Sequence, residues 1–346
     1  MRYRLLGRSG LRVSELCLGT MTFGTDWGWG ADEAECARIL EAFADAGGNF
    51  VDTASNYTNG SSEQIVGKLT RANRDRWVLA TKYTLTLDPH DPNAGGNHRK
   101  SLVRALEQSL RRLETDRVDL LWLHMRDATT PIEEFVRALD DQVRPGKVLY
   151  VGISDSPAWV VARANAIAEL RGWSPFVALQ LPYNVASREP ERELLPMAAE
   201  LGLTVTPWSV LGAGVLTGRP AEDLRWPDET VSERTQAVVH VVRELAPECD
   251  CSPAQIAIAW LLGRSAPEIV PIVGVRSSVQ LADNLGALDV TLSAEQRQKL
   301  DEAGAPSLGF PRSFLESGGV RELIYGETWK LLYSGGARPR HEAVAR

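Results

Sequence analysis

The sequence predicts an α/β protein folded as a single (β/α)8 TIM barrel, with an N-terminal β-hairpin before the barrel and a helical tail after it. Eight short apolar runs alternate with helical patterns from about residue 14 to 290. The runs are nearly continuous in apolar residues, as in WVLATK and VDLLWLH, which is typical of parallel strands buried on both faces. The rival fold, an open doubly wound sheet, would carry a GxGxxG motif after its first strand, and none follows that strand here.

The elements follow one another regularly along the chain. YRLLGRSGLRV at residues 3–13 predicts a hairpin that turns at Ser9 and Gly10. The apolar positions Cys36, Ile39, Leu40 and Phe43, spaced i, i+3, i+4, i+7, predict the first helix. Two further stripes predict helices: Leu102, Leu106, Leu110 and Leu113, and Phe135, Val136, Leu139 and Val143. The predicted strands are Ser14–Gly19, Asn49–Ala54, Trp77–Lys82, Val118–His124, Val148–Ser154, Phe176–Leu181, Thr204–Ser209 and Ile269–Gly274.

Serines mark several helix starts: Ser61 with Gln64 at capping-box spacing, Ser156 before Pro157, and Ser252 before Pro253. Residues 211–231 form a long insertion after the seventh strand, and its length indicates a functional loop. After Leu292 we expect a helix capped by Ser293, a helical stretch near 320–332, and a frayed terminus, GGARPRHEAVAR. Residues 1–346 are expected to form one domain, with the barrel at about 14–290 and the C-terminal helix and tail at about 293–346.

Composition excludes several functional classes. The chain has 346 residues, a net charge of −7 and 44% hydrophobic residues, so it is neither disordered nor a nonspecific nucleic-acid binder. Its N-terminus lacks the apolar stretch of a signal peptide, and no run has the length of a membrane span. The four cysteines, Cys17, Cys36, Cys249 and Cys251, have neither zinc nor redox spacing. We expect a reduced, cytoplasmic protein with no metal, no nucleic-acid partner and no membrane partner, and the sequence predicts no oligomeric partner.

Four titratable side chains converge where strands end. The second strand ends at Asp52, with Tyr57 in the loop beyond it, the third ends at Lys82, and the fourth at His124. In a barrel, functional groups gather at the carboxyl ends of the strands. We expect Asp52 and Lys82 to pair, and the Lys82 cation to lower the pKa of Tyr57 so that the phenol can donate a proton near neutral pH. With His124 hydrogen-bonded to the same oxygen, the set suits hydride addition to a carbonyl group.

These residues resemble the aldo-keto reductase superfamily. GGNFVDTASNY at 47–57, Lys82 in LATKY, His124 in LHMRD, and IVPIVGVRSSVQLADN at 269–284 are similar to the family's signatures, in the same order, and the resemblance covers about residues 3–303. It implies a catalytic tetrad of Asp52, Tyr57, Lys82 and His124, with Tyr57 as the general acid. It also implies carbonyl reduction, because relatives that reduce activated C=C bonds carry Glu in place of the histidine.

The resemblance further implies that NADPH, or NADP+ in the reverse direction, binds across the barrel mouth. Asp155 replaces the usual Asn, and Asp283 the commoner Glu. Trp208 would stack on the nicotinamide ring, and Arg276 would clamp a 2′-phosphate, which favours NADPH over NADH. The full implied set of cofactor-binding residues is Gly19, Thr20, Asp52, Ser154, Asp155, Gln180, Trp208, Ser209, Leu211, Gly212, Gly214, Gly274, Arg276, Ser277, Gln280 and Asn284.

The substrate, a small carbonyl compound, is expected to meet Tyr57 and His124 beside an aromatic wall. The first rim loop, TMTFGTDWGWG, offers Phe23, Trp27 and Trp29 for this wall, and Arg126 could meet an anionic substrate group or remain a solvated charge. The leading hypothesis is therefore an NADPH-dependent carbonyl reductase. Two alternatives are a redox-sensing accessory or regulatory subunit with slow turnover, and a barrel isomerase or lyase in which Lys82 forms a Schiff base.

Overall fold

The computed structural model describes residues 1–220 and 231–331, with the side chains of Arg321, Trp329 and Lys330 left out. The chain divides into two compact units, Met1–Pro306 and Ser307–Arg346. Within the described residues, no helix is long and apolar enough to cross a bilayer. The expected terminus GGARPRHEAVAR and residues 221–230 of the insertion at 211–231 lie outside the described residues. The domain boundaries drawn from the sequence stay a prediction.

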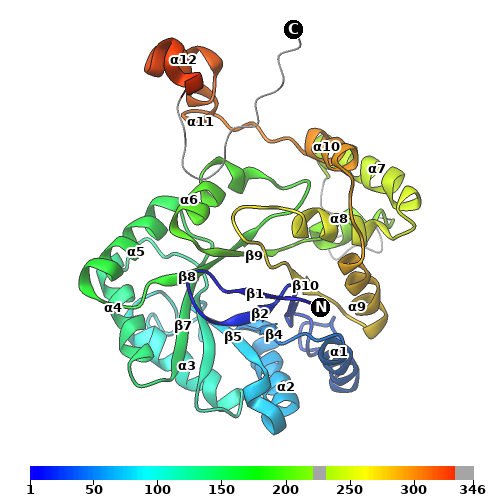
Figure 1. The fold of residues 1–346 in the computed structure, drawn as a ribbon. Coiled ribbons are helices and arrows are strands. Elements are labelled where there is room, and N and C mark those ends of the chain that lie inside the picture. Colours follow the sequence, from blue (N-terminus) through cyan, green and yellow to red (C-terminus); the bar gives the residue numbers. More distant parts are fainter. Residues whose placement is uncertain (221–230, 332–346) are drawn as a thin grey trace. The chain divides into compact units, whose positions relative to one another are not determined.

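Eight parallel strands form the predicted (β/α)8 barrel in the first unit (Figure 1). Their order in the sheet is β10-β3-β4-β5-β6-β7-β8-β9. A bridge between Val205 of β9 and Ile269, which precedes β10, links the two ends of this order. The strands are β3 (Cys17–Gly19), β4 (Phe50–Asp52), β5 (Val78–Tyr83), β6 (Val118–Leu123), β7 (Val148–Ser154), β8 (Phe176–Pro182), β9 (Thr204–Trp208) and β10 (Ile272–Gly274). Each overlaps one of the eight predicted strands.

The first and last barrel strands are shorter than predicted. Ser14 belongs to the hairpin strand β2 (Arg12–Ser14) and pairs with Tyr3, so the barrel strand begins only at Cys17. Before β10, Pro271 has no N–H to donate to the sheet, and only the isolated bridge at Ile269 precedes it.

The N-terminal hairpin is present, but its turn differs from the predicted one. Strand β1 (Tyr3–Leu5) pairs with β2 in antiparallel register, and the Leu6 N–H donates to the Leu11 carbonyl across a four-residue loop. Gly7 has φ of 58°, and a Cβ there would lie 2.1 Å from the Val177 carbonyl oxygen. The chain therefore reverses through a loop that requires glycine at position 7, and the predicted tight turn at Ser9 and Gly10 is not formed.

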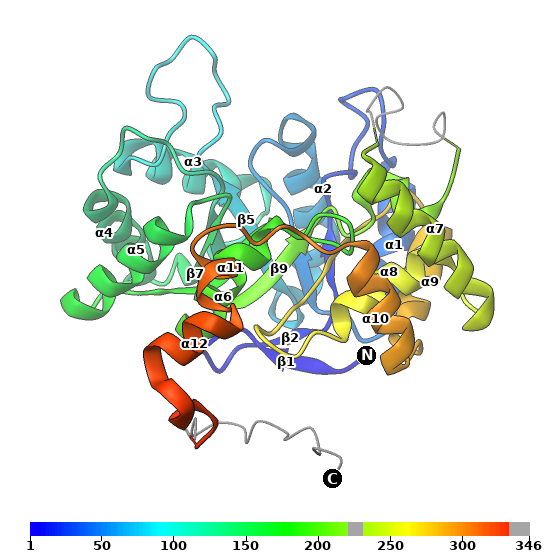
Figure 2. The ribbon, with the colours of Figure 1, turned by 90° about the horizontal axis from the view of Figure 1, so that it is seen from above.

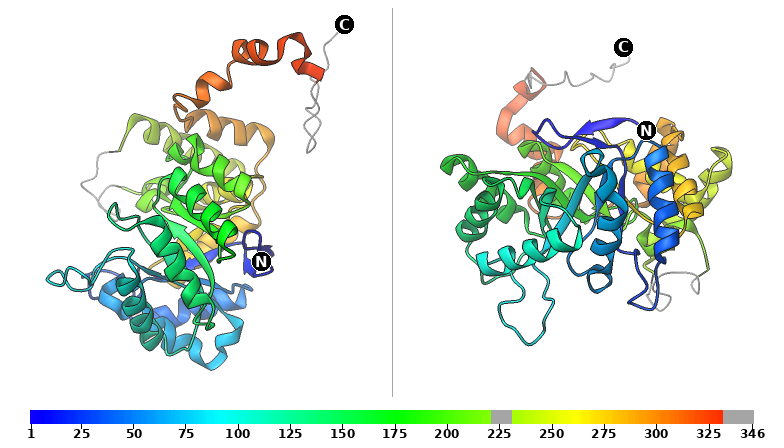
Figure 3. Two further views of the ribbon diagram at one scale, coloured as in Figure 1. Left: turned by 90° about the vertical axis from the view of Figure 1, so that its left-hand side faces the viewer. Right: turned by 90° about the horizontal axis from the view of Figure 1, so that it is seen from below.

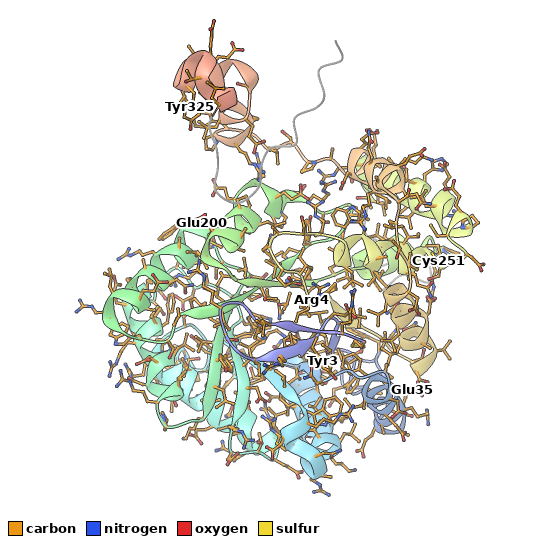
Figure 4. The ribbon with its side chains drawn as sticks, viewed as in Figure 1. Tyr3, Arg4, Glu35, Glu200, Cys251 and Tyr325 are labelled. Carbon is orange, nitrogen blue, oxygen red and sulfur yellow. The ribbon has the colours of Figure 1, made fainter. Side chains whose placement is uncertain are left out.

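The hairpin and the functional loops occupy opposite ends of the barrel. Leu6 and Val13 pack with Phe50 and Trp122 in the barrel interior, and Figure 2 shows the hairpin at one end and the loop between β5 and α3 at the other. The Tyr3 hydroxyl, marked in Figure 4, donates to the Gly47 carbonyl at 2.9 Å and fastens the hairpin to the segment before β4. The hairpin therefore covers the amino end of the barrel.

Helices surround the barrel (Figure 2, Figure 3), and their apolar faces are buried against the strands. The predicted stripe Cys36, Ile39, Leu40 and Phe43 is fully buried on α1. The helices of this unit are α1 (Glu33–Asp45), α2 (Ser61–Thr70), α3 (Arg99–Arg112), α4 (Ile132–Val143), α5 (Ala158–Arg171), α6 (Leu194–Leu201), α7 (Glu233–Glu248), α8 (Pro253–Leu262), α9 (Ser278–Leu285) and α10 (Ala294–Ala303). The second unit contains α11 (Arg312–Leu315), α12 (Gly318–Tyr325) and a 3-10 segment, η7 (Gly326–Leu331).

Two of the four serines that were predicted to cap a helix do so. Ser252 and Ser293 form capping boxes with Gln255 and Gln296, as expected. The prediction at Ser61 is wrong, because Gly60 is the N-cap and the Thr58 Oγ1 accepts the Ser62 N–H. Ser156 does not cap α5 either: its hydroxyl donates to the Ser154 carbonyl, and Pro157 is the N-cap.

Gly152 on β7 faces the indole ring of Trp122 inside the barrel. A Cβ at Gly152 would lie 2.4 Å from the Trp122 ring, which is wholly buried. We expect Gly152→Ala to lower the free energy of unfolding by about 1–3 kcal/mol, because a packed interior accommodates an added methyl group only through strain. Denaturant unfolding measures the loss. The matched control is Gly10→Ala, which meets nothing within 4 Å. An equal effect of both substitutions would contradict this account.

Candidate active site

A cavity of about 400 Å³ opens at the carboxyl ends of the barrel strands. Its wall includes strand-end residues of β3, β4, β8, β9 and β10, namely Gly19, Asp52, Gln180, Trp208 and Gly274. Tyr57 and His124 also line it, whereas Lys82 lies behind Tyr57 with no exposed surface. The side chains that the sequence singled out for chemistry therefore meet at one cavity.

Lys82 connects the buried group. Its ammonium forms an ion pair with Asp52, donates to the Thr53 carbonyl at 2.8 Å, and donates to the Tyr57 hydroxyl at 2.9 Å. Asp52 also accepts from Gln180 Nε2 at 3.2 Å. Burial lowers the pKa of Lys82, but the Asp52 carboxylate and Tyr57 outweigh it and raise the pKa above its ordinary value. Lys82 is therefore charged, which removes the neutral amine that a Schiff-base mechanism requires.

Tyr57 is held by an unusual turn. It begins a 3-10 segment, η1 (Tyr57–Gly60), in which Thr58 and Asn59 have left-handed φ values of 44° and 56°. A β-branched residue in this region is strained. The Thr58 hydroxyl is fixed by donating to the Phe23 carbonyl at 2.7 Å and accepting the Ser62 N–H at 3.0 Å. These bonds hold the strained turn and thereby aim the phenol into the cavity.

The pKa of Tyr57 differs in direction from the prediction. Burial raises it above the ordinary value for tyrosine, and the Lys82 charge opposes this without overcoming it. The expected lowering of the Tyr57 pKa is therefore wrong. Burial disfavours the phenolate form more strongly than the Lys82 ammonium favours it. Tyr57 is protonated at neutral pH and has a proton to donate.

His124 is a neutral group beside the phenol. Its ring lies edge-on to that of Tyr57, with centroids 6.2 Å apart, and only 8% of the residue is exposed. Burial, with a smaller contribution from the Lys82 charge, lowers the pKa of His124 to about 3. A neutral imidazole can donate one hydrogen bond to a substrate oxygen without supplying the reaction's proton.

The segment after β9 turns through left-handed backbone beside the cavity. Ser209, Gly212, Ala213 and Gly214 all have positive φ, from 55° to 106°. Two of its amides are used within the segment, since the Gly212 N–H donates to the Ser209 carbonyl at 2.9 Å and the Gly214 N–H to the Leu211 carbonyl at 3.0 Å. Asn184 Nδ2 holds the segment by donating to the Ser209 carbonyl at 2.8 Å.

A second polar segment follows β10. Arg276 is exposed and lines the cavity, and its guanidinium has no hydrogen bond or ion pair within the part of the chain that the structure describes. Its backbone N–H donates to Gln280 Oε1 at 2.8 Å, and Ser277 caps α9. Glu35 of α1 accepts the Ser278 N–H at 2.5 Å and fixes the start of α9 (Figure 4). The unpaired guanidinium is thus presented on a fixed loop.

Comparison with known proteins identifies the family. The sequence profile of the Aldo/keto reductase family matches residues 15–305. This chain belongs to the aldo/keto reductase family. It is 39% identical to norsolorinic acid reductase of Aspergillus flavus over 99% of this chain and 92% of the fungal protein. It is 36% identical to aryl-alcohol dehydrogenase (NADP+) of Phanerodontia chrysosporium over 91% of this chain and 89% of that protein. The chain is an oxidoreductase, and the family's reaction is carbonyl reduction.

Several residues assigned by resemblance line the cavity of this aldo/keto reductase, and others lie behind it. Ser209, Leu211, Gly214, Gln280 and Asn284 line it together with the strand-end residues. Four others do not: Thr20, Ser154, Gly212 and Ser277. Thr20 is buried, and its hydroxyl donates to the Asp52 carbonyl at 3.0 Å, so its contact is with the protein. Buried Ser154 Oγ has no partner among the described residues, which leaves it a donor for a bound group.

The aromatic wall is smaller than the sequence predicted. Trp27 lines the cavity, but Phe23 is wholly buried in the core, so its assignment to the substrate wall is wrong. Trp29 is also absent from the wall and packs beside Trp27, with ring centroids 5.7 Å apart. Further apolar wall comes in part from residues that the sequence did not single out, such as Met21, Leu85 and Met125.

Arg126 does not line the cavity. Its guanidinium donates to Asn97 Oδ1 at 3.2 Å and to the Thr130 carbonyl at 2.7 Å, and it lies over the Phe135 ring. These contacts join the loop after β5 to the loop after β6 and correct the predicted anion contact. By contrast, Arg219 lines the cavity and was not singled out. The sequence could have indicated Arg219, because this residue lies in the insertion at 211–231 whose length indicates a functional loop.

Proposed function

We propose that this chain is an NADPH-dependent reductase of aldehydes or ketones, with Tyr57 as the general acid. The observation that carries the proposal is the 2.9 Å hydrogen bond between Lys82 Nζ and a Tyr57 hydroxyl that lines the cavity. A protonated phenol backed by a fixed ammonium can give up its proton to a carbonyl oxygen as negative charge develops there. The resulting phenolate would lie beside the Lys82 charge.

The residues present fit a dinucleotide. Ser209, Leu211 and Gly214 line the cavity beside the exposed Arg276, and the unpaired guanidinium of Arg276 offers a bidentate site for a phosphate. Buried Ser154 Oγ and Asn56 Oδ1 have no partners among the described residues and could serve an amide group. When bound, the reduced nicotinamide supplies the hydride that adds to the carbonyl carbon. The protein's part is to hold the carbonyl oxygen against Tyr57 and His124 and to supply its proton.

The apolar wall of Trp27, Leu85 and Met125 supports a substrate with a flat apolar body. The relatives' names, aryl-alcohol dehydrogenase and norsolorinic acid reductase, support aromatic carbonyl compounds in particular. The test is the consumption of NADPH with a panel of aromatic and aliphatic aldehydes and ketones, followed by nicotinamide absorbance. We expect turnover to be fastest with aromatic aldehydes. No oxidation of NADPH with any member of the panel would overturn the proposal.

Arg276 should determine the preference for NADPH over NADH. Arg276→Leu is expected to raise the KM for NADPH about tenfold or more, because a charge-assisted contact to the 2′-phosphate is lost. The KM for NADH should change little, since NADH carries no such phosphate. Steady-state kinetics with both cofactors measures the difference. Arg171→Leu removes the same charge from the exposed end of α5 and is the control. A parallel rise for both cofactors would contradict this role for Arg276.

A further inference from the structure

Asp155 places a carboxylate in the cavity next to the proposed reaction centre. It follows β7, lines the cavity, and has a left-handed φ of 37°. Its Oδ1 accepts from Trp208 Nε1 at 3.2 Å, and its backbone N–H donates to the Gln180 carbonyl at 3.2 Å. Its charge acts on Tyr57, whose pKa it contributes to raising. Asp155 is thus fixed in position in the same cavity that Tyr57 lines.

This carboxylate is not compensated locally. Asp52 and Lys82 form a buried ion pair and cancel one another's charge. Tyr57 and His124 are neutral at neutral pH, because burial raises the pKa of the phenol and lowers that of the imidazole. No ion pair joins Asp155 to a cation among residues 1–220 and 231–331. Asp155 therefore has no ion-pair partner among the described residues; burial raises its pKa above the ordinary value, and the Trp208 hydrogen bond and the Lys82 charge oppose that shift.

The position of the nicotinamide follows from the chemistry of the proposed function. Hydride and proton go to adjacent atoms of one carbonyl group, so the ring that gives the hydride must lie near Tyr57. It then also lies near Asp155. The oxidised ring carries a positive charge and the reduced ring is neutral, so a carboxylate at this place attracts one form and not the other.

We propose that Asp155 makes this protein bind the oxidised cofactor more tightly than the reduced one, and so shifts the equilibrium between the bound species toward carbonyl reduction. In this direction the carbonyl compound takes a hydride from NADPH and a proton from the protein, yielding alcohol and NADP+. The charge of Asp155 stabilises only the NADP+ side of this exchange. The inference rests on the proposed function, because it requires a nicotinamide cofactor in this cavity.

Asp155→Asn removes the charge and keeps the shape. The asparagine oxygen can still accept from Trp208, and asparagine tolerates a left-handed φ better than most residues, so the variant should fold. We expect its Kd for NADP+ to rise about tenfold, which is the size of one charge interaction weakened by partial solvation. Its Kd for NADPH should change less than about twofold. The ratio of the Kd for NADP+ to the Kd for NADPH should therefore rise when the charge of Asp155 is removed.

The experiment titrates the protein with NADP+ and with NADPH and follows tryptophan fluorescence, so it does not depend on turnover. Asp283→Asn is the matched control: Asp283 also lines the cavity, but it belongs to α9 and contacts Gln255. It should alter both affinities alike and leave their ratio unchanged. A ratio that shifts only in Asp155→Asn supports the inference. An unchanged ratio with both cofactors still bound overturns the inference alone, whereas no binding of either cofactor by the natural protein overturns it together with the proposed function.

Discussion

Tyr57→Phe is expected to lower kcat for carbonyl reduction by about a thousandfold, which is typical for the loss of a positioned general acid. The substitution removes one oxygen and keeps the ring that lines the cavity. Without the hydroxyl, the negative charge that develops on the substrate oxygen has no proton donor held by Lys82. His124 cannot replace it as an acid near neutral pH, because burial lowers its pKa to about 3 and it carries no extra proton.

Single-turnover kinetics with NADPH and an aromatic aldehyde measures the effect on the chemical step. The Kd for NADPH should stay near that of the natural protein, since the phenol acts on the substrate oxygen. Tyr150→Phe is the matched control, because Tyr150 lies on β7 outside the cavity wall and loses the same atom. Turnover of the Tyr57 variant at the natural rate would remove Tyr57 from the mechanism.

Lys82→Met should be costly for stability as well as for activity. The substitution leaves the Asp52 carboxylate, only 2% exposed, without its counter-charge. Breaking a buried ion pair in this way lowers the free energy of unfolding by about 3–5 kcal/mol. Activity should fall as well, because the phenolate formed by proton transfer loses the ammonium that stabilises it.

The double variant Asp52→Asn/Lys82→Met separates the two effects. With both charges removed, no uncompensated ion remains, so most of the lost stability should return while activity stays low. Denaturant unfolding of the natural protein, both single variants and the double variant provides the measurement. If the double variant were as unstable as Lys82→Met, the loss would come from packing around the lysine stem rather than from the stranded charge.

The sequence predicted the barrel because each strand carries its own signal. Strands buried on both faces need continuous apolar runs, and helices packed on one face need spaced ones, so VDLLWLH and the α1 stripe are legible locally. Asp52, Lys82 and His124 could be placed at one rim for the same reason: each ends or directly follows a strand. The resemblance added residues such as Arg276, which no local pattern distinguishes from a surface arginine.

Features that depend on several segments at once required the tertiary structure. Phe23 and Trp27 lie in one glycine-rich loop with no periodicity, so only the folded loop decides which ring enters the core and which faces the cavity. Arg126 follows His124 in sequence, but its partners Asn97 and Thr130 come from two different loops. The pKa of Tyr57 depends on how completely the walls exclude water, compared with the contribution of Lys82.

By itself, the sequence determined the order of the elements, the fold and the identity of the groups at the rim, because these follow from patterns within single segments. Only the tertiary structure decided which side chains line the cavity, which are held by other loops, and that Asp155 has no ion-pair partner among the described residues. The physical reason is that burial, hydrogen bonding and electrostatic balance are sums over residues distant in the chain, and folding alone brings those residues together.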